Sequence, residues 1–365
     1  MKMIILIILS AAIASIQPST ASAIWKGKVI YQILTDRFDK TNSDVIPCAE
    51  LDTYCGGTFE GARKRLDYVT NLGVDAIWMS PFVENTKNGY HGYWAKDLYD
   101  VNEKFGTKEE LKALISDAHE KNLLVMADVV VNHMGQGMED VPSLSPFNDT
   151  SFFHDCGCVD GDCCPKSCWV EDFHNPKQML HCQLFGLPDL NQDLPVVADE
   201  LKSWIVWMIK EYNIDGIRLD TVPYVKSTYW KEFTEAANVF SIGEVSTNDL
   251  NEMKTYVTSG AMNAVLQYPL YYSSVASFGR LESFQVVSDT IKHAQSIFGD
   301  NVDYLGLFSE NHDNPRFLSI RDDVCTLFFG SPNIRFSSLT VMQLTRQNFI
   351  LQSRYEHSKI LFCLH

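Results

Sequence analysis

Short apolar runs alternate with longer segments of helical period along most of this chain. Strands are expected at 28–34, 76–81, 123–131, 215–220, 240–245, 264–270 and 304–309. Helices are expected between them, including 58–72, 107–121, 197–212 and 283–298. A strand followed by a helix, repeated about seven times, predicts a parallel sheet with helices packed outside it. The length of 365 residues favours closure of the sheet into a (β/α)8 TIM-type barrel over residues 24–325, and a doubly wound open sheet is the alternative.

One connection is much longer than the others. After the strand expected to end near Val131, about sixty residues rich in Cys, Gly, Pro, Asp and His come before the next helix. Connections of that length are uncommon unless they are functional or fold on their own. Residues 134–190 are therefore expected to form a disulfide-rich loop domain inserted after the third strand of the barrel.

The first 23 residues have the layout of a secretory signal peptide. They contain one Lys, an apolar run from Met3 to Ile8 and an Ala-x-Ala ending at Ala23. We expect cleavage after Ala23 and a secreted, extracellular protein with no membrane contact after cleavage; an uncleaved membrane anchor is the alternative. The ten cysteines then favour disulfides over free thiols. A zinc site is the alternative for the six cysteines between Cys156 and Cys182.

The net charge restricts the kind of partner. Thirty Lys and Arg against 46 Asp and Glu leave a formal charge of -16, which repels nucleic acids and anionic lipids. A neutral polymer is not repelled. The aromatic residues, 12% of the chain, provide flat apolar faces on which sugar rings can stack.

Polar residues interrupt the apolar runs near their C-terminal ends. Residues two apart on a strand share a face, so Arg218 and Asp220 point together, away from Ile217 and Leu219. Helices cover the outside of a parallel barrel, so the charged pair is expected to point inward at the C-terminal end of its strand. Other strands end in the same way, with Asp128 and Asn132, Glu244, and His312 with Asp313. Acidic groups are thus expected to meet at one mouth of the barrel.

Carboxyl groups that meet in this way suit the cleavage of a glycosidic bond, which needs one ionised and one protonated carboxyl. We expect Asp220 to be the nucleophile, kept anionic by Arg218. Glu244, close to other negative charge, is expected to have a raised pKa and to act as general acid and then base. Asp313 is the expected third carboxylate, which holds sugar hydroxyls and favours the distorted ring. A buried ion pair kept for specificity is the alternative explanation for Arg218 and Asp220.

Five motifs, in this order, resemble the α-amylase family of glycoside hydrolases, in particular its secreted fungal-type members. They are DVVVNH (128–133), LPDL (187–190), GIRLDTV (216–222), IGEV (242–245) and FSENHDNPRF (308–317), supported by GVDAIWMSP (73–81) and YHGYW (90–94). The resemblance covers about residues 25–320. It implies a barrel with a domain inserted after the third strand. It also implies a monomer that hydrolyses internal α-1,4 bonds in starch, glycogen or malto-oligosaccharides by a retaining double displacement.

The resemblance implies roles for individual residues. Asp220 matches the family nucleophile, Glu244 the acid/base and Asp313 the transition-state stabiliser. The residues implied to contact sugar are Arg218, His133, His312, Tyr93 and Trp94. The implied Ca2+ ligands, all oxygen donors, are Asn132, Asp189 and the backbone carbonyl of Tyr224. The implied disulfides join Cys48 to Cys55, and Cys182 to Cys156 or Cys158.

Two regions depart from the family pattern. Pro223-Tyr224 replaces a Lys-His pair that contacts sugars on the leaving-group side, so a different product pattern or transfer activity is expected. Within the enzyme class, an α-glucosidase or a glucan transferase is the alternative activity. Residues 326–365 match nothing in the pattern, and the eighth strand and the C-terminal β-sandwich are expected to be missing, with the segment 334–344 as a possible substitute strand. A truncated, catalytically inactive carbohydrate-binding homologue is therefore the alternative to an active enzyme.

Overall fold

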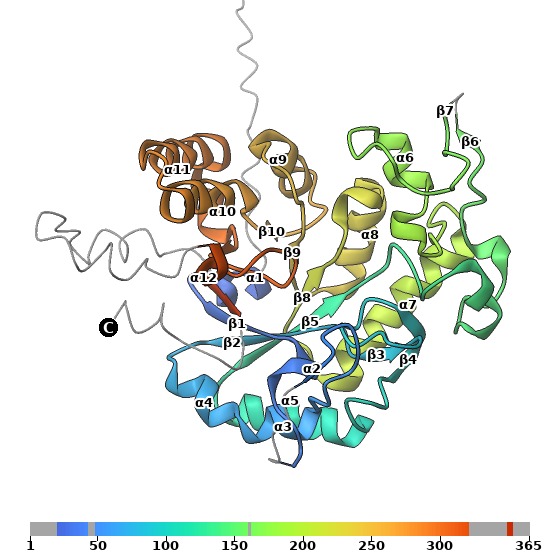
Figure 1. The fold of residues 1–365 in the computed structure, drawn as a ribbon, viewed down its shortest axis with the longest axis horizontal. Coiled ribbons are helices and arrows are strands. Elements are labelled where there is room, and N and C mark those ends of the chain that lie inside the picture. The colour runs from blue at the N-terminus through green and yellow to red at the C-terminus, as the bar shows by residue number, and fades with distance from the viewer. Residues whose placement is uncertain (1–19, 43–47, 160–161, 321–348, 353–365) are drawn as a thin grey trace, which may run out of the picture.

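The computed structural model describes residues 20–42, 48–159, 162–320 and 349–352, and its centre is an eight-stranded parallel sheet (Figure 1). The strand order is β10-β9-β8-β5-β2-β1-β12-β11. The strands are β1 (Val29–Ile33), β2 (Ala76–Met79), β5 (Leu124–Val129), β8 (Gly216–Leu219), β9 (Phe240–Gly243), β10 (Ala264–Val265), β11 (Leu307–Phe308) and β12 (Phe349–Gln352). A parallel bridge between Leu266 and Gly306 joins the two end strands, so the sheet closes into a TIM-type barrel.

The prediction that the eighth strand is missing is wrong. Strand β12 pairs in parallel with β1, from Val29↔Phe349 to Gln32↔Gln352, and with β11 on its other side. The segment 334–344, considered as a substitute strand, lies outside the described residues, as does the rest of the expected tail 326–365 apart from β12. The sequence pattern predicts no strand at β12, whose four residues lie beyond the segment considered as a substitute.

The seven strands expected from the sequence are confirmed, although some are shorter than expected. The largest difference is at 264–270, where the strand ends at Val265 and helix α10 (Tyr268–Ser274) begins. Pro269 occupies the first turn of that helix, where proline is favoured because its missing N–H would have no partner there.

Helices lie around the outside of the barrel (Figure 1). They are α1 (Thr20–Trp25), α2 (Thr35–Phe38), α3 (Phe59–Lys64), α4 (Leu66–Asn71), α5 (Lys108–Glu120), α7 (Pro195–Tyr212), α8 (Ser227–Ala237), α9 (Leu250–Thr258), α10, α11 (Gln285–Phe298) and α12 (Phe317–Ile320). The helix expected at 58–72 is two helices, α3 and α4, which meet at Arg65, where the backbone leaves helical geometry. Helix α5 begins with a complete capping box, in which Thr107 and Glu110 each accept a backbone N–H of the other.

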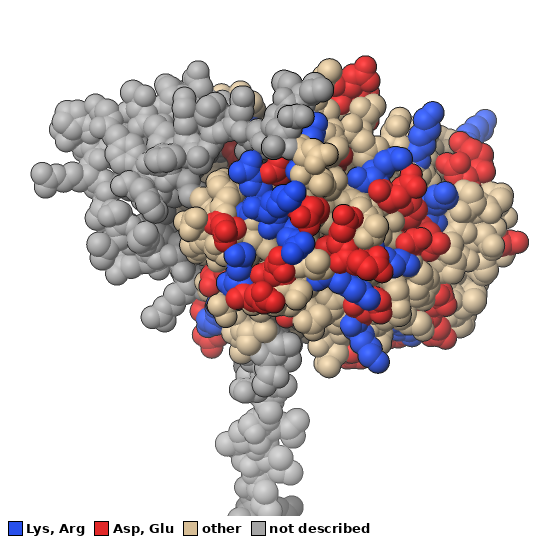
Figure 2. Space-filling model, turned by 90° about the horizontal axis from the view of Figure 1, so that it is seen from below, with Lys and Arg blue, Asp and Glu red and all other residues tan. Residues whose placement is uncertain are grey.

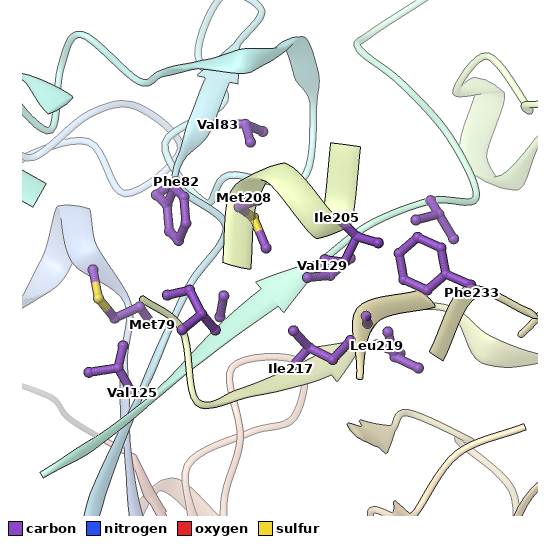
Figure 3. Packing of buried hydrophobic residues seen from close by; sticks show 14 of the residues in the cluster. Met79, Phe82, Val83, Val125, Val129, Ile205, Met208, Ile217, Leu219 and Phe233 are labelled. Carbon is purple, nitrogen blue, oxygen red and sulfur yellow. The ribbon is translucent and has the colours of Figure 1, made fainter. Parts of the chain in front are cut away.

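The alternation of side chains along the strands produces two separate apolar cores. The inward residues Ile30, Trp78, Met126, Phe240 and Ile242 form one buried cluster inside the barrel. The outward residues of the same strands pack against the helices in a second cluster, in which Val125, Val129, Ile217 and Leu219 meet Ile205, Met208 and Phe233 of α7 and α8 (Figure 3). This arrangement confirms the expected faces of β8 and leaves Arg218 inside the barrel.

Only short elements occur between β5 and α7. They are η1 (Met138–Ser143), η2 (Thr150–Phe152), β6 (Cys158–Val159), β7 (Asp162–Cys163), α6 (Pro176–His181) and η3 (Leu184–Gly186). The expected pairing of Cys182 with Cys156 or Cys158 is wrong, because Cys182 is bonded to Cys164. The Cys48–Cys55 disulfide is confirmed. That the segment 134–190 folds as a domain of its own stays a prediction.

Five shorter elements complete the described part of the chain. They are the strands β3 (Val83–Asn85) and β4 (Ala95–Val101), which form an antiparallel ribbon, and the helical turns η4 (Val222–Tyr224), η5 (Val275–Gly279) and η6 (Gly299–Tyr304). The expected signal peptide lies outside the described residues except for 20–23, which belong to α1. Trp25, the last residue of α1, is buried and stacks on Phe240 at the base of the barrel, with ring centroids 5.3 Å apart. Within the described residues, no helix is long and apolar enough to span a membrane.

Acidic and basic side chains are interspersed on the face of the molecule in Figure 2. The excess negative charge is therefore not gathered into a single acidic patch on this face. Many of the charges are paired in exposed salt bridges, such as Lys121 with Asp67 at 2.6 Å. Such surface pairs contribute little to stability, so the fold depends chiefly on the two apolar cores.

We predict that β12 is needed to close the barrel. A chain ending at residue 348 should unfold at a lower temperature than a chain ending at residue 352, because β1 and β11 lose their shared partner and become open edges. Several lost backbone hydrogen bonds at about 1 kcal/mol each, with about 2–4 °C per kcal/mol, predict a difference on the order of 10 °C in Tm. Circular-dichroism melts measure it, and equal melting temperatures would show that β12 does not close the sheet.

Candidate active site

The guanidinium of Arg218 contacts three carboxylates inside the barrel. Its Nη1 lies 2.8 Å from Oδ1 of Asp128 and 2.6 Å from Oδ1 of Asp220, and its Nη2 lies 2.9 Å from Oε2 of Glu244. The arginine is only 1% exposed. Arg218 and Asp220 do form a buried ion pair, but the pair is not isolated, because one cation is shared by the ends of three neighbouring strands.

The strands bring these carboxylates to one mouth of the barrel. Asp128 lies near the end of β5, Asp220 directly follows β8 and Glu244 directly follows β9. All three have the inward parity of their strands, and the C-terminal ends of parallel strands share one edge. The expectation that acidic groups from separate strands meet at one mouth is thus met by these three residues.

A chain of hydrogen bonds extends the site from Asp128. Its Oδ2 accepts hydrogen bonds from Trp78 Nε1 at 3.0 Å and from the hydroxyl of Tyr93 at 2.8 Å. The Tyr93 hydroxyl also lies 2.7 Å from Nε2 of His312. That same Nε2 lies 3.4 Å from Oδ1 of Asp313. Of the residues predicted for the site, Tyr93, His312 and Asp313 therefore join the group around Arg218.

Glu244 is held by two further donors. Its Oε2 accepts the backbone N–H of Thr221 at 3.0 Å, and its Oε1 accepts the hydroxyl of Tyr268 at 3.2 Å. Asn311 in turn donates to the Tyr268 hydroxyl at 3.0 Å. These bonds fix the position of a carboxylate whose side chain is still 15% exposed and so remains open to a ligand.

Loss of water dominates the acidity of the carboxyl groups. Burial raises the pKa of Asp220 to about 6, against the lowering effect of Arg218. Burial also raises the pKa of Glu244, with Arg218 lowering it and Asp220 raising it further. The pKa of Asp313 is raised to about 6, first by desolvation and then by the charge of Glu244. The charge of Arg218 lowers the pKa of Asp220, as expected, but this charge is shared among three carboxylates.

Two predicted sugar contacts, His133 and Trp94, have partners in the segment around Tyr93. His133 is 3% exposed, and its Nε2 lies 3.1 Å from the backbone carbonyl of Tyr93. The Trp94 ring meets the ring of His91 edge to face at 4.6 Å. The structure thus places both beside the Tyr93 segment, and their contact with a sugar stays a prediction.

Three oxygen atoms converge beside the site. The amide end of Asn132 lies 3.2 Å from the backbone carbonyl of Tyr224 and 3.3 Å from Oδ1 of Asp189. When the amide oxygen faces those two acceptors, only a cation satisfies all three. When the amide is turned by 180°, its NH2 group donates to both oxygens instead. Asn132 therefore contacts the other two residues predicted as metal ligands, and the binding of Ca2+ by these three residues stays a prediction.

Among the described residues, cysteine and histidine provide no comparable site. In the part of the chain that the structure describes, no group of three or more His, Cys, Asp or Glu side chains has the arrangement of a metal centre. His154 instead pairs with Asp189 through Nδ1 at 2.7 Å from Oδ2, which leaves Oδ1 toward Asn132.

Sequence reasoning missed several polar residues of the site. They are Gln32, Trp78, Tyr268 and Asn311, and Asp128 was noticed at a strand end without being assigned a role. Gln32 and Trp78 have the inward parity of β1 and β2 and are paired in register. The alternation that located Arg218 could have found these two. Tyr268 and Asn311 lie outside the strands, where no periodicity points to them.

Comparisons with known proteins agree with this geometry. The sequence model of "Alpha amylase, catalytic domain" matches residues 32–343. The chain is 36% identical to alpha-amylase 1 of Lipomyces kononenkoae over 326 residues, which is 84% of this chain and 50% of that protein. The chain spans 50% to 61% of the length of the first two curated relatives that it matches.

Two solved structures are similar to it. An alpha-amylase from Malbranchea cinnamomea has a TM-score of 0.79 and 31% identity, and the match covers 91% of this chain and 69% of that one. An alpha-amylase from Geobacillus thermoleovorans, solved in complex with acarbose, has a TM-score of 0.76 and 29% identity, with 93% of this chain and 77% of that one covered.

We predict that Arg218 stabilises the fold in a pH-dependent way. Arg218→Met leaves three buried carboxylates without their cation and should lower the free energy of unfolding by about 3–5 kcal/mol at pH 8. The loss should shrink toward pH 4. Without the cation the folded-state pKa values of the carboxyls rise further above their unfolded values near 4, so the folded variant keeps protons and loses stability only as pH increases.

Denaturant unfolding of both proteins at pH 4.5 and pH 8 measures this difference. Arg218→Lys is the matched control, because it keeps a positive charge but not the planar fork that reaches three partners. It should show a smaller loss with a weaker dependence on pH. A loss for Arg218→Met that is the same at both pH values would contradict the sharing of one cation by ionised carboxylates.

Proposed function

Because this chain belongs to the family of alpha-amylase catalytic domains, we propose that it hydrolyses internal α-1,4-glucosidic bonds of starch- or glycogen-type chains. The proposed course is a retaining double displacement. The observation that carries the proposal is the shared contact of Arg218 with Asp220 and Glu244 at the mouth of the barrel. It keeps two carboxyl groups from adjacent strands within reach of one linkage, as such cleavage requires.

In the proposed reaction Asp220 is the nucleophile. Its carboxylate attacks the anomeric carbon while Glu244 gives its proton to the departing glycosidic oxygen, so that a glycosyl-enzyme ester replaces the broken C–O bond. Water then attacks the same carbon and gives its proton to Glu244, which releases Asp220. The raised pKa of Glu244 supports its role as the acid, and a pKa of about 6 leaves Asp220 largely ionised at neutral pH.

The remaining site residues hold the sugar. Asp313 is about half exposed, with 47% of its side chain open to solvent, so it can accept hydrogen bonds from sugar hydroxyls. Tyr93, His312 and Arg218 lie around the carboxylates and form the floor on which the sugar rests. His133 and Trp94 extend this surface along the Tyr93 segment.

We expect loss of the nucleophile to abolish hydrolysis without unfolding the protein. Asp220→Asn should lower the release of reducing ends from soluble starch on the order of 10^4-fold or more, because no covalent intermediate can form. Asp199→Asn, an exposed acidic residue of α7, is the matched control and should retain activity. Proton NMR of fresh products from the unaltered protein should show the α-anomer first, as retention requires.

The outcomes of this assay separate the alternatives. If the unaltered protein and Asp220→Asn are equally inactive while both bind malto-oligosaccharides and melt cooperatively, the chain is a carbohydrate-binding homologue. If the products from maltotriose include chains longer than the substrate, the activity is glucan transfer. Tyr224 stands in the replaced Lys-His pair, which supports testing this second activity. Burial, followed by the charges of Glu244 and Asp220, raises the pKa of its phenol to about 12.

We also propose a Ca2+ site formed by Asn132, Asp189 and the carbonyl of Tyr224. An amide oxygen, a carboxylate and a backbone carbonyl are the donors this ion prefers, and the convergence of their oxygens fits it. A bound ion would link the end of β5 to the loop segment 187–190 and to η4, because each of these segments would provide one of its oxygen ligands. Its contribution is structural, and no proton transfer is assigned to it.

Calcium should raise the thermal stability of the protein. At a concentration of 100 times Kd the gain is about 2.7 kcal/mol, and Mg2+ should not replace it because it demands a smaller, stricter geometry. Asp189→Asn should abolish the shift in Tm between Ca2+ and chelator, whereas Asp193→Asn, an exposed neighbour paired with Lys226, should keep it. An equal shift in all three proteins would place the ion elsewhere.

Residues 1–23 support a secreted, extracellular location for the proposed enzyme, with starch, glycogen or malto-oligosaccharides as its partners. The structural relative solved with acarbose is consistent with a carbohydrate ligand. The absence of a nucleic-acid partner rests on the net charge of -16. A monomeric state stays a prediction.

A further inference from the structure

Gln32 is a buried polar residue on the inner face of β1 whose side chain contacts the site. Its amide Nε2 lies 2.9 Å from Nδ1 of His312, a residue 280 positions away in the chain. The glutamine is 3% exposed. Its Oε1 has no hydrogen-bond partner among the described residues. Only the donor end of this amide is therefore engaged with the protein, and that end faces the histidine.

His312 is a neutral imidazole in this environment. Burial lowers its pKa to about 3, and the positive charge of Arg218, followed by His91 and Arg316, lowers it further. A neutral imidazole carries its single proton on either Nδ1 or Nε2, and the hydrogen bond made by one nitrogen determines which of the two is protonated. The two forms differ in what the ring can offer to a ligand.

We propose that Gln32 is a positioning residue that holds His312 in the form protonated at Nε2. An amide NH2 group can only donate, so Nδ1 must accept and the ring proton must lie on Nε2. The proton then points to the side of the ring that faces Tyr93 and Asp313. This inference rests on the proposed function for its catalytic consequence, but not for the protonation state itself.

The other partners of His312 require the same form. The phenol of Tyr93 keeps its proton, because burial raises its pKa well above the usual value, and that proton is donated to Oδ2 of Asp128 at 2.8 Å. The Tyr93 oxygen must therefore accept the hydrogen bond from His312 Nε2 at 2.7 Å. The result is one consistent direction of donation from Gln32 through His312 and Tyr93 to Asp128.

A His312 ring protonated at Nδ1 would disrupt this direction of donation at two hydrogen bonds. A proton on Nδ1 would face the NH2 group of Gln32, which places a donor against a donor. An unprotonated Nε2 would direct its lone pair toward Oδ1 of Asp313 at 3.4 Å and compete with Asp128 for the single Tyr93 proton. Each such mismatch leaves a buried polar group without its hydrogen bond, which is unfavourable, so the Nε2–H form is favoured.

The consequence for the proposed reaction is a donor of fixed position beside Asp313. A sugar hydroxyl that enters between these residues can share the His312 Nε2–H with the Tyr93 oxygen and donate to the Asp313 carboxylate, so the donor is in place before the sugar binds. A preorganised donor loses no energy in reorienting when the substrate arrives. An apolar residue of the same size at position 32 would pack inside the barrel but leave only the Tyr93 and Asp128 contacts to favour the Nε2–H form, so the preference for that form would weaken.

Nitrogen NMR of the protein labelled with 15N-histidine tests the protonation state directly. In the unaltered protein we expect His312, identified by the loss of its signals in His312→Gln, to show a protonated Nε2 and an unprotonated Nδ1. In Gln32→Glu the carboxylate accepts, so the proton should move to Nδ1 or the ring should become charged. Gln32→Met should show exchange between the two forms. Gln267→Met, a matched loss of another buried glutamine, should leave the His312 signals unchanged.

Kinetics on a chromogenic maltoside supply the second measurement. Gln32→Glu and Gln32→Met should lower kcat/KM about 10–100-fold, as the loss of an outer partner of a site residue commonly does. The melting temperature of Gln32→Met should fall no more than that of Gln267→Met. A proton on Nδ1 in the unaltered protein, or an unchanged state in Gln32→Glu, overturns the inference. The expected protonation state in a protein without hydrolytic activity would leave the inference standing and remove the proposed function.

Discussion

One shared cation organises the interior of this barrel. Three carboxylates at the ends of adjacent strands carry a charge that burial would otherwise make very costly, and a single guanidinium contacts all of them. The pKa of Arg218 is raised well above its usual value by these partners, although its own burial acts in the opposite direction. Its positive charge is therefore permanent. The acidity of the surrounding carboxyls is set by how that one charge is divided and by how little water remains.

Two directed chains of hydrogen bonds surround this centre and end on different carboxylates. One runs from Gln32 to Asp128 through a histidine and a tyrosine, and the other runs from Asn311 through Tyr268 to Glu244. Each chain ends in a donor to a carboxylate, which lowers the pKa of that group against the effect of burial. Burial in the site thus disfavours the ionised form of the carboxyl groups, and the fixed hydrogen-bond donors determine which of these groups carry the negative charge.

Much of this arrangement could be read from the sequence, because strand parity and strand ends are local properties. The inward direction of Arg218 and Asp220 follows from the apolar residues on either side of them, and the meeting of Asp220 with Glu244 follows from the common edge of parallel strands. The partner of Cys182 could not be obtained in this way, because several cysteines lie at similar distances along the chain. The tyrosine at 268 lies beyond the end of its strand, where alternation gives no information.

The sequence by itself determined which residues face the interior and at which end of the barrel they lie, since side-chain alternation and the covering helices leave one choice for each strand. Only the tertiary structure decided which of those residues touch. The sharing of Arg218 with Asp128 depends on the register of β5 against β8, and the contact of Gln32 with His312 joins positions 280 residues apart. The closure of the barrel by β12 was also decided only by the tertiary structure. This strand is identified by its pairing with β1 and β11 and not by its own residue pattern.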